Sequence, residues 1–201
     1  WGNEHPAGVA HADPWVQIAA TSEYQTKTTM RLFPGMVTKQ LKAEHSLDLG
    51  KIVIYSNHGA GVIEGVTRSP VSLEGARSTF VIRNEGQHWL ERNDGHEMAD
   101  VIDRNVVKSA DGQGRAVTFG NAPEPSEDSM LLREREAFEA IEAGKSAATG
   151  ILYDSLEAPP DAPMTPEGIP QVIEGVRGDS HWLDIPRITA TILDPKRSPQ
   201  V

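Results

Sequence analysis

The sequence predicts an α/β fold in which helices flank a mainly parallel sheet. Short runs rich in β-branched and aromatic residues alternate along the chain with segments of helical periodicity, an alternation typical of parallel sheets. A polar pair follows each of two consecutive core runs, Asn84-Glu85 after the first and Gly120-Asn121 after the second. Because right-handed connections put the ends of parallel strands on one edge of a sheet, we expect the two pairs to lie close together. Ligands of open α/β sheets bind at such an edge.

Composition narrows the class of protein. The 201 residues suffice for one domain with a hydrophobic core and an appended fragment. The formal net charge of −10 argues against a generally basic nucleic-acid-binding surface but leaves room for a local basic patch. The absence of cysteine excludes disulfides and thiolate metal sites, and no apolar run reaches membrane-spanning length. Since the chain starts at Trp1 without Met and ends after a charged, Pro-containing run, we expect both ends to be cut from a longer protein.

The first half of the chain is expected to contain four strands and one long helix. Ser22 caps the helix, predicted over residues 23–41, and Pro34 kinks or divides it. A hairpin-like turn at 56–61 joins the second strand to the third, and a loop over 69–78 leads into the fourth. The strands are predicted at residues 15–20, 51–55, 62–67 and 79–82.

The second half continues the alternation and then changes in composition. A turn is predicted at 111–114, and the Pro-rich stretch 158–166 reads as a linker or surface loop. A domain boundary is therefore expected between residues 157 and 158. Strands are predicted at 115–119 and 149–156, and helices at 96–108, 126–142, 166–176 and 180–193.

The strand end Asn84-Glu85 carries the catalytic hypothesis. A carboxylate at the end of a buried strand sits on a rigid support, where it suits a metal-bound water or the role of general base. A strand ending in a polar-acid pair, then a helix, then a strand ending in a small polar residue matches the half of a nucleotidase core that holds magnesium, activates water and senses the γ-phosphate. The alternative is that both pairs are solvated strand ends without chemistry.

The phosphate-binding half of such a core is missing from the sequence. Its signature is a glycine-rich loop that ends in Gly-Lys-Ser/Thr. Gly144-Lys145-Ser146 is the single such triplet, but Glu139 stands where the first glycine belongs, and the triplet follows a helix. We interpret Gly144 as a helix stop. The prediction is a P-loop NTPase core of the ASCE type that lacks its phosphate-loop segment, whose natural place is upstream of Trp1.

Several segments together resemble one protein family. Residues 14–26 resemble the strand and turn that follow the phosphate loop in large terminase subunits of tailed bacteriophages, and residues 73–89 resemble their Walker B segment. Residues 95–105 and 121–129 are similar to the sequence that follows in the actinobacteriophage branch. The resemblance covers nearly the whole chain, and it is specific as a set although each piece alone is weak.

The resemblance implies a DNA-packaging motor. ATP hydrolysis with Mg²⁺ would drive double-stranded DNA into a procapsid. The implied partners are the portal protein and the small terminase subunit, with a homo-oligomeric ring on the portal, no membrane, and the host cytoplasm as location. Residues 1–157 would be the ATPase-domain core without its Walker A loop, and residues 158–201 the linker and the start of the lid. The family's nuclease domain has no counterpart in this chain.

The family's roles map onto a few positions. Glu85 matches the base that activates water, and Asn84 matches the magnesium contact. Asn121, with Gly120 beside it, matches the position that senses the γ-phosphate. Arg77 could act in trans as an arginine finger, and Gln25 could touch the nucleotide, but a surface arginine and a helix-surface glutamine are the alternatives at these two positions.

One departure from the family weakens the metal site. Many relatives carry Asp-Glu where this chain has Asn84-Glu85. Asn accepts a hydrogen bond from metal-bound water but brings no charge, so magnesium affinity should be lower or depend on the phosphates. Two further classes stay open: a non-catalytic prophage remnant or nucleic-acid-binding scaffold, and another α/β hydrolase that pairs Glu85 with His88. His58, His88 and His96 lack the i, i+4 spacing of helical metal ligands.

Overall fold

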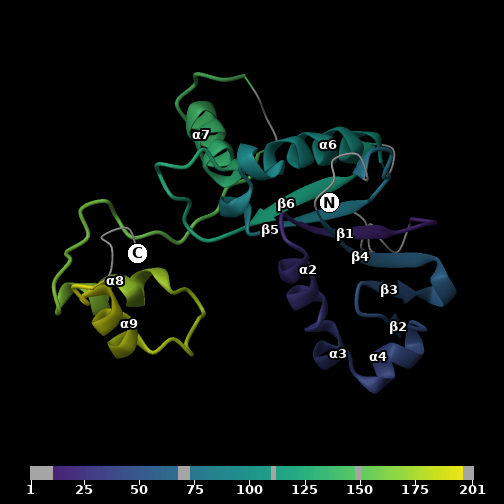
Figure 1. Ribbon diagram of the computed structural model, residues 1–201, viewed down its shortest axis with the longest axis horizontal. Coiled ribbons are helices and arrows are strands. Elements are labelled where there is room, and N and C mark those ends of the chain that lie inside the picture. The colour runs from purple at the N-terminus through teal and green to yellow at the C-terminus, as the bar shows by residue number, and fades with distance from the viewer. Residues whose placement is uncertain (1–10, 68–72, 110–111, 148–150, 197–201) are drawn as a thin grey trace. The chain divides into compact units, whose positions relative to one another are not determined.

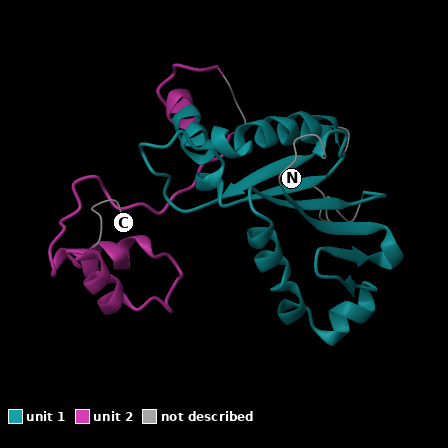
Figure 2. Ribbon diagram, in the orientation of Figure 1, with its two compact units in different colours: residues 1–137 teal, residues 138–201 magenta. Residues whose placement is uncertain are grey.

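The computed structural model describes residues 11–67, 73–109, 112–147 and 151–196. The chain divides into two compact units, residues 1–137 and 138–201, which Figure 2 shows in different colours. The boundary predicted between residues 157 and 158 stays a prediction. The first unit contains the sheet and the candidate site, and each unit is described by itself below.

The first unit is built on a six-stranded sheet of order β2-β3-β4-β1-β5-β6 (Figure 1). Strands β4, β1, β5 and β6 run parallel to one another, whereas β2, β3 and β4 form an antiparallel meander. This mixed, mostly parallel sheet with flanking helices confirms the predicted fold class. The strands are β1 Trp15–Ala20, β2 Asp48–Leu49, β3 Val53–Ser56, β4 Gly61–Thr67, β5 Phe80–Asn84 and β6 Arg115–Phe119.

Helices cover both faces of the sheet (Figure 1). Successive residues of a strand point to opposite faces, and the two sides of β1 belong to different core clusters. Ile18 packs with Met30 of α2 (Glu23–Met30) in one cluster, whereas Ala19 belongs to a larger cluster with α6 (Gly95–Lys108). The apolar stripe of α6 is buried as its spacing predicts: Met98, Val101, Ile102 and Val106.

The helix predicted over residues 23–41 is divided into three. Helix α2 stops at Met30, and the chain continues as α3 (Phe33–Met36) and α4 (Lys39–Glu44). Pro34 lies in the first turn of α3, where its missing N–H breaks no hydrogen bond. The predicted division at this proline is therefore confirmed. Thr38 caps α4 by accepting a hydrogen bond from the Leu41 N–H at 3.1 Å.

The helix predicted from residue 126 begins later than expected, because α7 spans Met130–Glu142. The side chain of Ser129 accepts a hydrogen bond from the Leu132 N–H at 3.2 Å, which is the contact of an N-cap. Ser126 instead donates to Glu124. The sequence offers two serines in the right context, and only the tertiary structure selects between them.

The strand predicted over residues 149–156 is wrong for its described part. Residues 148–150 lie outside the described residues, and residues 151–157 form neither strand nor helix. The apolar side chains of Ile151, Leu152 and Leu156 are exposed, and Tyr153 stacks on Phe138 with ring centroids 5.4 Å apart. An apolar, β-prone run remains irregular when no neighbouring strand pairs with it.

Two short helices follow in the second unit, and both differ slightly from their predicted bounds. Helix α8 spans Gly168–Val176 and α9 spans Ile185–Ile192, so each begins later than expected. Asp184 caps α9 by accepting from the Arg187 N–H at 3.1 Å. None of the described helices is long and apolar enough to cross a membrane.

Candidate functional site

The carboxyl ends of three parallel strands form the rim on which the site lies. Ala19 of β1 pairs with Arg83 of β5, and Asn84 at the end of β5 pairs with Phe119 at the end of β6. The residues that follow these strands therefore leave the sheet at the same edge. Asn84-Glu85 and Gly120-Asn121 lie side by side there, as the sequence predicts.

Glu85 has an unusual backbone for its residue type. Its φ of 59° and ψ of 53° are left-handed, a region that costs a residue with a Cβ about 1–2 kcal/mol. The chain turns sharply here from β5 into a 3₁₀ turn, Gly86–His88, and the Glu85 side chain is half-buried at the rim. Strained residues gather at functional sites, so this outlier supports a functional hypothesis for Glu85.

Trp89 stabilises the turn that follows β5. Its side chain is fully buried in the main core cluster, and its indole N–H donates to the backbone carbonyl of Asn84 at 3.0 Å. A buried tryptophan usually finds such a partner for its N–H. Trp89 thereby fixes the last carbonyl of β5, directly before Glu85.

Gln87 joins the two polar strand ends, which the sequence reading did not foresee. Its side-chain N–H donates to Glu85 Oε2 at 2.6 Å. Its side-chain oxygen accepts from the backbone N–H of Asn121 at 3.2 Å. Gln87 is nearly buried, with 9% of its surface exposed. The sequence shows only a glutamine two positions after the acid, and its partner Asn121 lies 34 residues away.

Gly120 allows the two strand ends to approach closely. A Cβ at this position would lie 2.4 Å from the side-chain oxygen of Gln87 and 3.2 Å from the backbone nitrogen of Gly86. Contacts below 3.0 Å are not tolerated by real Cβ atoms. The small residue that the sequence places after β6 is therefore needed for the Gln87 contact to form.

The other predicted site residues occupy different places. Gln25 lies in the first turn of α2, just after the carboxyl end of β1, and its side-chain oxygen is buried without a hydrogen-bond partner among the described residues. Arg77 is exposed and precedes β5. It therefore lies at the opposite end of that strand from Glu85, and the chain does not bring these two side chains together.

An ion-pair cluster around the buried Arg83 side chain lies next to the rim. Arg83 of β5, whose side chain is 5% exposed, contacts Asp103 of α6 and lies 3.1 Å from Glu134 of α7. Thr118 of β6 donates to the same Glu134 oxygen at 3.0 Å. Burial raises the pKa of Glu134, against the lowering effects of the Arg83 charge and the Thr118 hydroxyl. The cluster ties α6 and α7 to the strands that carry the polar pairs, and a lone arginine in an apolar run was its sequence signal.

The three histidines lie in separate environments. His58 is hydrogen bonded to Ser46 at 3.1 Å, and His96 contacts the backbone carbonyl of Asp128 at 2.8 Å. The His88 side chain is exposed. It makes no hydrogen bond with Glu85, whose described side-chain partner is Gln87. This arrangement does not favour a hydrolase that pairs Glu85 with His88.

Gly144 ends α7 as expected. Its φ of 66° is left-handed, and the Lys145 N–H donates to the Ala140 carbonyl at 2.8 Å. These are features of a glycine C-cap. The Gly144-Lys145-Ser146 triplet is thus an exposed helix end and not a phosphate loop.

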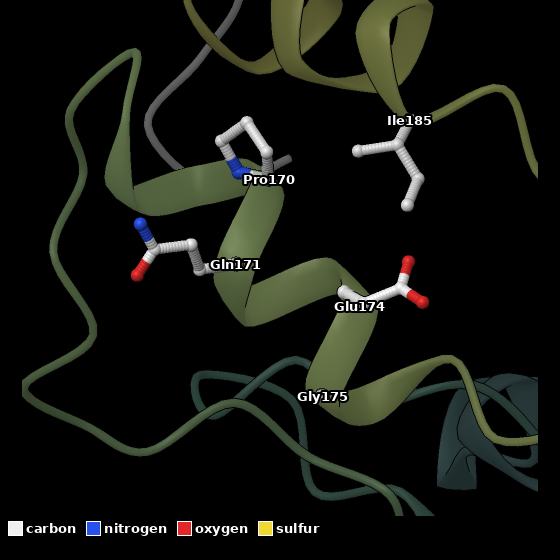
Figure 3. Close-up of a pocket in the computed structure, with 5 residues that line it drawn as sticks. All are labelled: Pro170, Gln171, Glu174, Gly175 and Ile185. Carbon is white, nitrogen blue, oxygen red and sulfur yellow. The ribbon is translucent and has the colours of Figure 1, made fainter.

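The second unit has a surface hollow of its own (Figure 3). It has a volume of about 570 Å³ and is lined mainly by the residues of α8 with Ile185 of α9. In the close-up, the Glu174 carboxylate lies near the Ile185 side chain. The hollow contains none of the predicted site residues.

The mostly parallel sheet and its flanking helices resemble the fold of a solved large terminase. The chain aligns with the crystal structure of the HK97 bacteriophage large terminase with a TM-score of 0.61 and 16% sequence identity, over 91% of this chain and 38% of that one. No family model matches the sequence. The resemblance to large terminase subunits is confirmed by this likeness of fold.

Two phage proteins are similar to the chain in sequence. The Gene 13 protein of Mycobacterium phage L5 is 40% identical in an alignment of 212 positions that covers 96% of this chain and 35% of that protein. The Gene 13 protein of Mycobacterium phage D29 is 41% identical in an alignment of 204 positions that covers 92% of this chain and 34% of that protein. The chain therefore spans about a third of the length of these relatives.

Proposed function

We propose that the chain is part of the ATPase of a viral DNA-packaging motor and that Glu85 is the base that activates the attacking water. The observation that carries the proposal is the shared rim, where Glu85 and Asn121 are joined through the Gln87 side chain. General bases act from within hydrogen-bond reach of the water they deprotonate. Glu85 is half-buried on a fixed turn, which suits that role.

The donor set at the rim fits a magnesium ion held mainly by phosphates. Asn84 offers an amide oxygen and Glu85 a carboxylate, both hard oxygen donors of the kind that Mg²⁺ prefers. No group of three or more acidic or histidine side chains that could hold a metal gathers among the described residues. With ATP bound, the ion would neutralise charge developing on the γ-phosphate. Asn84 would accept a hydrogen bond from one of its waters.

The roles of the other predicted site residues follow from where each residue lies in the fold. Asn121 and Gly120 would sense the γ-phosphate from the end of β6, beside the base. Gln25 has a buried oxygen that lacks a donor in the described chain, and a nucleotide hydroxyl or amino group would supply one. Arg77 lies too far along β5 to act on its own Glu85. Its proposed role as an arginine finger is therefore in trans, toward a neighbouring subunit of a ring.

The phosphate loop would belong to a segment that pairs with β6. Both edges of β5 are paired, whereas the outer edge of β6 has no partner strand among the described residues. A further strand parallel to β6 would end at the same rim as Asn84 and Asn121. A loop that follows such a strand would bring its backbone N–H groups to the phosphates there.

The wider role is proposed for a parent protein, by which we mean a protein of the relatives' length that contains this chain. Such a parent would move double-stranded DNA into a procapsid as a homo-oligomeric ring on the portal protein, together with a small terminase subunit. It would act in the host cytoplasm during assembly. The terminase-like fold and the mycobacteriophage relatives support this role.

Substitution of the base tests the proposal. In the parent protein, Glu85→Gln keeps the shape of the side chain but removes its basicity, so ATP turnover should fall about 10²–10⁴-fold. Steady-state phosphate release measures this. Glu91→Gln is the matched control because Glu91 is exposed after the same turn, and it should retain wild-type turnover. Wild-type turnover by Glu85→Gln would end the assignment of Glu85 as base.

The second candidate is a non-catalytic remnant or a nucleic-acid-binding scaffold with the same fold. Asn84 favours it, because this position lacks the charge that an aspartate would bring to magnesium. This candidate predicts no nucleotide-dependent thermal shift in the parent protein. The motor predicts stabilisation of about 2.7 kcal/mol when Mg-ATP is present at one hundred times its Kd.

A further inference from the structure

We propose that Gln87 is a positioning residue that transmits the state of the Asn121 loop to the base Glu85. This inference rests on the proposed function and deepens it, because it names the residue that couples sensing to water activation. Gln87 holds Glu85 with one end of its amide and the backbone of Asn121 with the other. Among the described residues, no other side chain joins residues 84–87 to residues 120–121 by hydrogen bonds.

The orientation of the Gln87 amide is determined by its partners. A backbone N–H can only donate, so the atom facing Asn121 at 3.2 Å must be the side-chain oxygen. The other end is then the NH₂ group, which faces Glu85 Oε2 at 2.6 Å. A carboxyl oxygen accepts a hydrogen bond from such a donor. The two contacts therefore fix the orientation of the Gln87 amide, with its oxygen toward Asn121 and its NH₂ group toward Glu85.

The surroundings of Gln87 leave little room for an alternative position. Gln87 is nearly buried, and the absence of a Cβ at Gly120 creates the space that its oxygen occupies, 2.4 Å from the place a Cβ would take. The left-handed backbone at Glu85 aims the carboxylate toward this amide. A displacement of the Gly120-Asn121 loop must therefore move the Gln87 oxygen or break its hydrogen bond.

The consequence is a restraint on one oxygen of the base. While Asn121 holds Gln87, Glu85 Oε2 is engaged, and its second oxygen is left for water. When the loop moves on binding a γ-phosphate, the amide moves with it and changes the orientation of the carboxylate. Precise orientation of a reacting group contributes strongly to rate, so loss of the relay should lower turnover without a matching loss of ATP affinity.

Two substitutions in the parent protein separate this role from simple packing. Gln87→Met has a similar length but no hydrogen-bonding groups, so kcat should fall about 10–100-fold while KM for ATP changes less than about threefold. Gln87→Glu places a second carboxylate beside Glu85. Like charges raise the pKa of one member of such a pair. The acidic limb of the kcat–pH profile should therefore move to higher pH, and kcat should recover as the pH rises further.

Controls identify loss of folding. Gln113→Met changes the same residue type at an exposed turn away from the rim, so its kcat and pH profile should match wild type. Melting temperatures of all variants check the folded state. As a measurement independent of turnover, Gln87→Met should speed hydrogen exchange at the Asn121 amide in the folded chain, since that N–H loses its acceptor, and Gln113→Met should not.

The outcomes distinguish the relay from the proposed function. If Glu85→Gln is inactive but both Gln87 variants keep wild-type kcat and an unshifted acidic limb, the relay is overturned and the motor assignment survives. If Glu85→Gln retains wild-type turnover, the relay and the assignment of Glu85 as base are both overturned. Unchanged exchange at the Asn121 amide in folded Gln87→Met would overturn the geometry on which the relay depends.

Discussion

At the scale of single residues, Glu85 combines a strained backbone with the candidate chemistry. Its left-handed conformation costs about 1–2 kcal/mol, and neighbouring contacts maintain it: the turn at Gly86–His88, the Gln87 amide and the Trp89 indole beneath Asn84. The strain persists because several separate contacts hold the same turn in place. The backbone that carries the carboxylate is therefore held in one conformation in this structure.

Trp89 gives a stability prediction at this scale. Trp89→Phe removes the N–H that donates to the Asn84 carbonyl and leaves space in the core, so the free energy of unfolding should fall by about 1–3 kcal/mol. Chemical denaturation measures the change. Trp182→Phe is the control, because Trp182 is 79% exposed, and it should shift the free energy of unfolding by less than about 0.5 kcal/mol. Equal effects of the two substitutions would show that the Asn84 contact contributes nothing.

The sequence predicts which residues lie at the rim but not which side chains connect them. Asn84, Glu85 and Asn121 could be predicted to converge because strand periodicity and the rules of parallel crossovers are local and general. Gln87 and Arg83 could not, since their partners are 34 and 51 residues away and depend on the register between β5 and β6 and on the position of α7.

At the scale of elements, α7 is fastened to the sheet by Glu134. This carboxylate meets Arg83 of β5 and Thr118 of β6, the two strands that end in the polar pairs. Elements whose boundaries depend on such contacts were predicted least well. Helix α6 was predicted almost to the residue because its apolar stripe is continuous, whereas the start of α7 depends on Ser129, and residues 151–157 form no strand without a partner.

The raised pKa of Glu134 leads to a prediction about pH. Because the folded-state pKa lies above the ordinary value of 4.5, the folded protein binds more protons than the unfolded chain just above that pH. The contribution of Glu134 to the free energy of unfolding is therefore complete below its unfolded pKa and declines as pH rises through the folded pKa. Glu134→Gln removes this decline, so its stability should vary less with pH over this window.

Denaturant unfolding at a series of pH values from about 4 to 7 measures the difference. Glu136→Gln on the same helix is the control, because Glu136 is exposed, and its stability should follow the wild-type pH dependence. Asp103 is the second carboxylate at Arg83 and remains in both variants. If Glu134→Gln and Glu136→Gln show the same pH dependence as wild type, the burial of Glu134 has no energetic consequence.

At the scale of the whole molecule, the described sheet ends beside the candidate site with β6, whose outer edge is unpaired. Strand β1 covers one edge of β5, and β6 covers the other, but no described strand covers β6 itself. Phe119, at the end of β6, is 56% exposed. Natural proteins rarely leave such an edge without protection. The chain also spans about a third of its relatives' length, so the proposal that a further strand of the parent protein pairs here accounts for both facts.

Hydrogen exchange on β6 tests that proposal. The Arg115 N–H donates to the Thr79 carbonyl, and N–H groups alternate sides along a strand, so those of Ala116 and Thr118 face the open edge. In the isolated chain these two amides should exchange quickly. In the parent protein a paired strand should protect them, and mass spectrometry of peptides spanning residues 115–119 should register two additional slow amides. Peptides spanning β5 are the internal control, because that strand is paired on both edges in either form. Identical exchange of the β6 peptides in both forms would place the phosphate-binding segment elsewhere and leave the nucleotide site without its proposed second half.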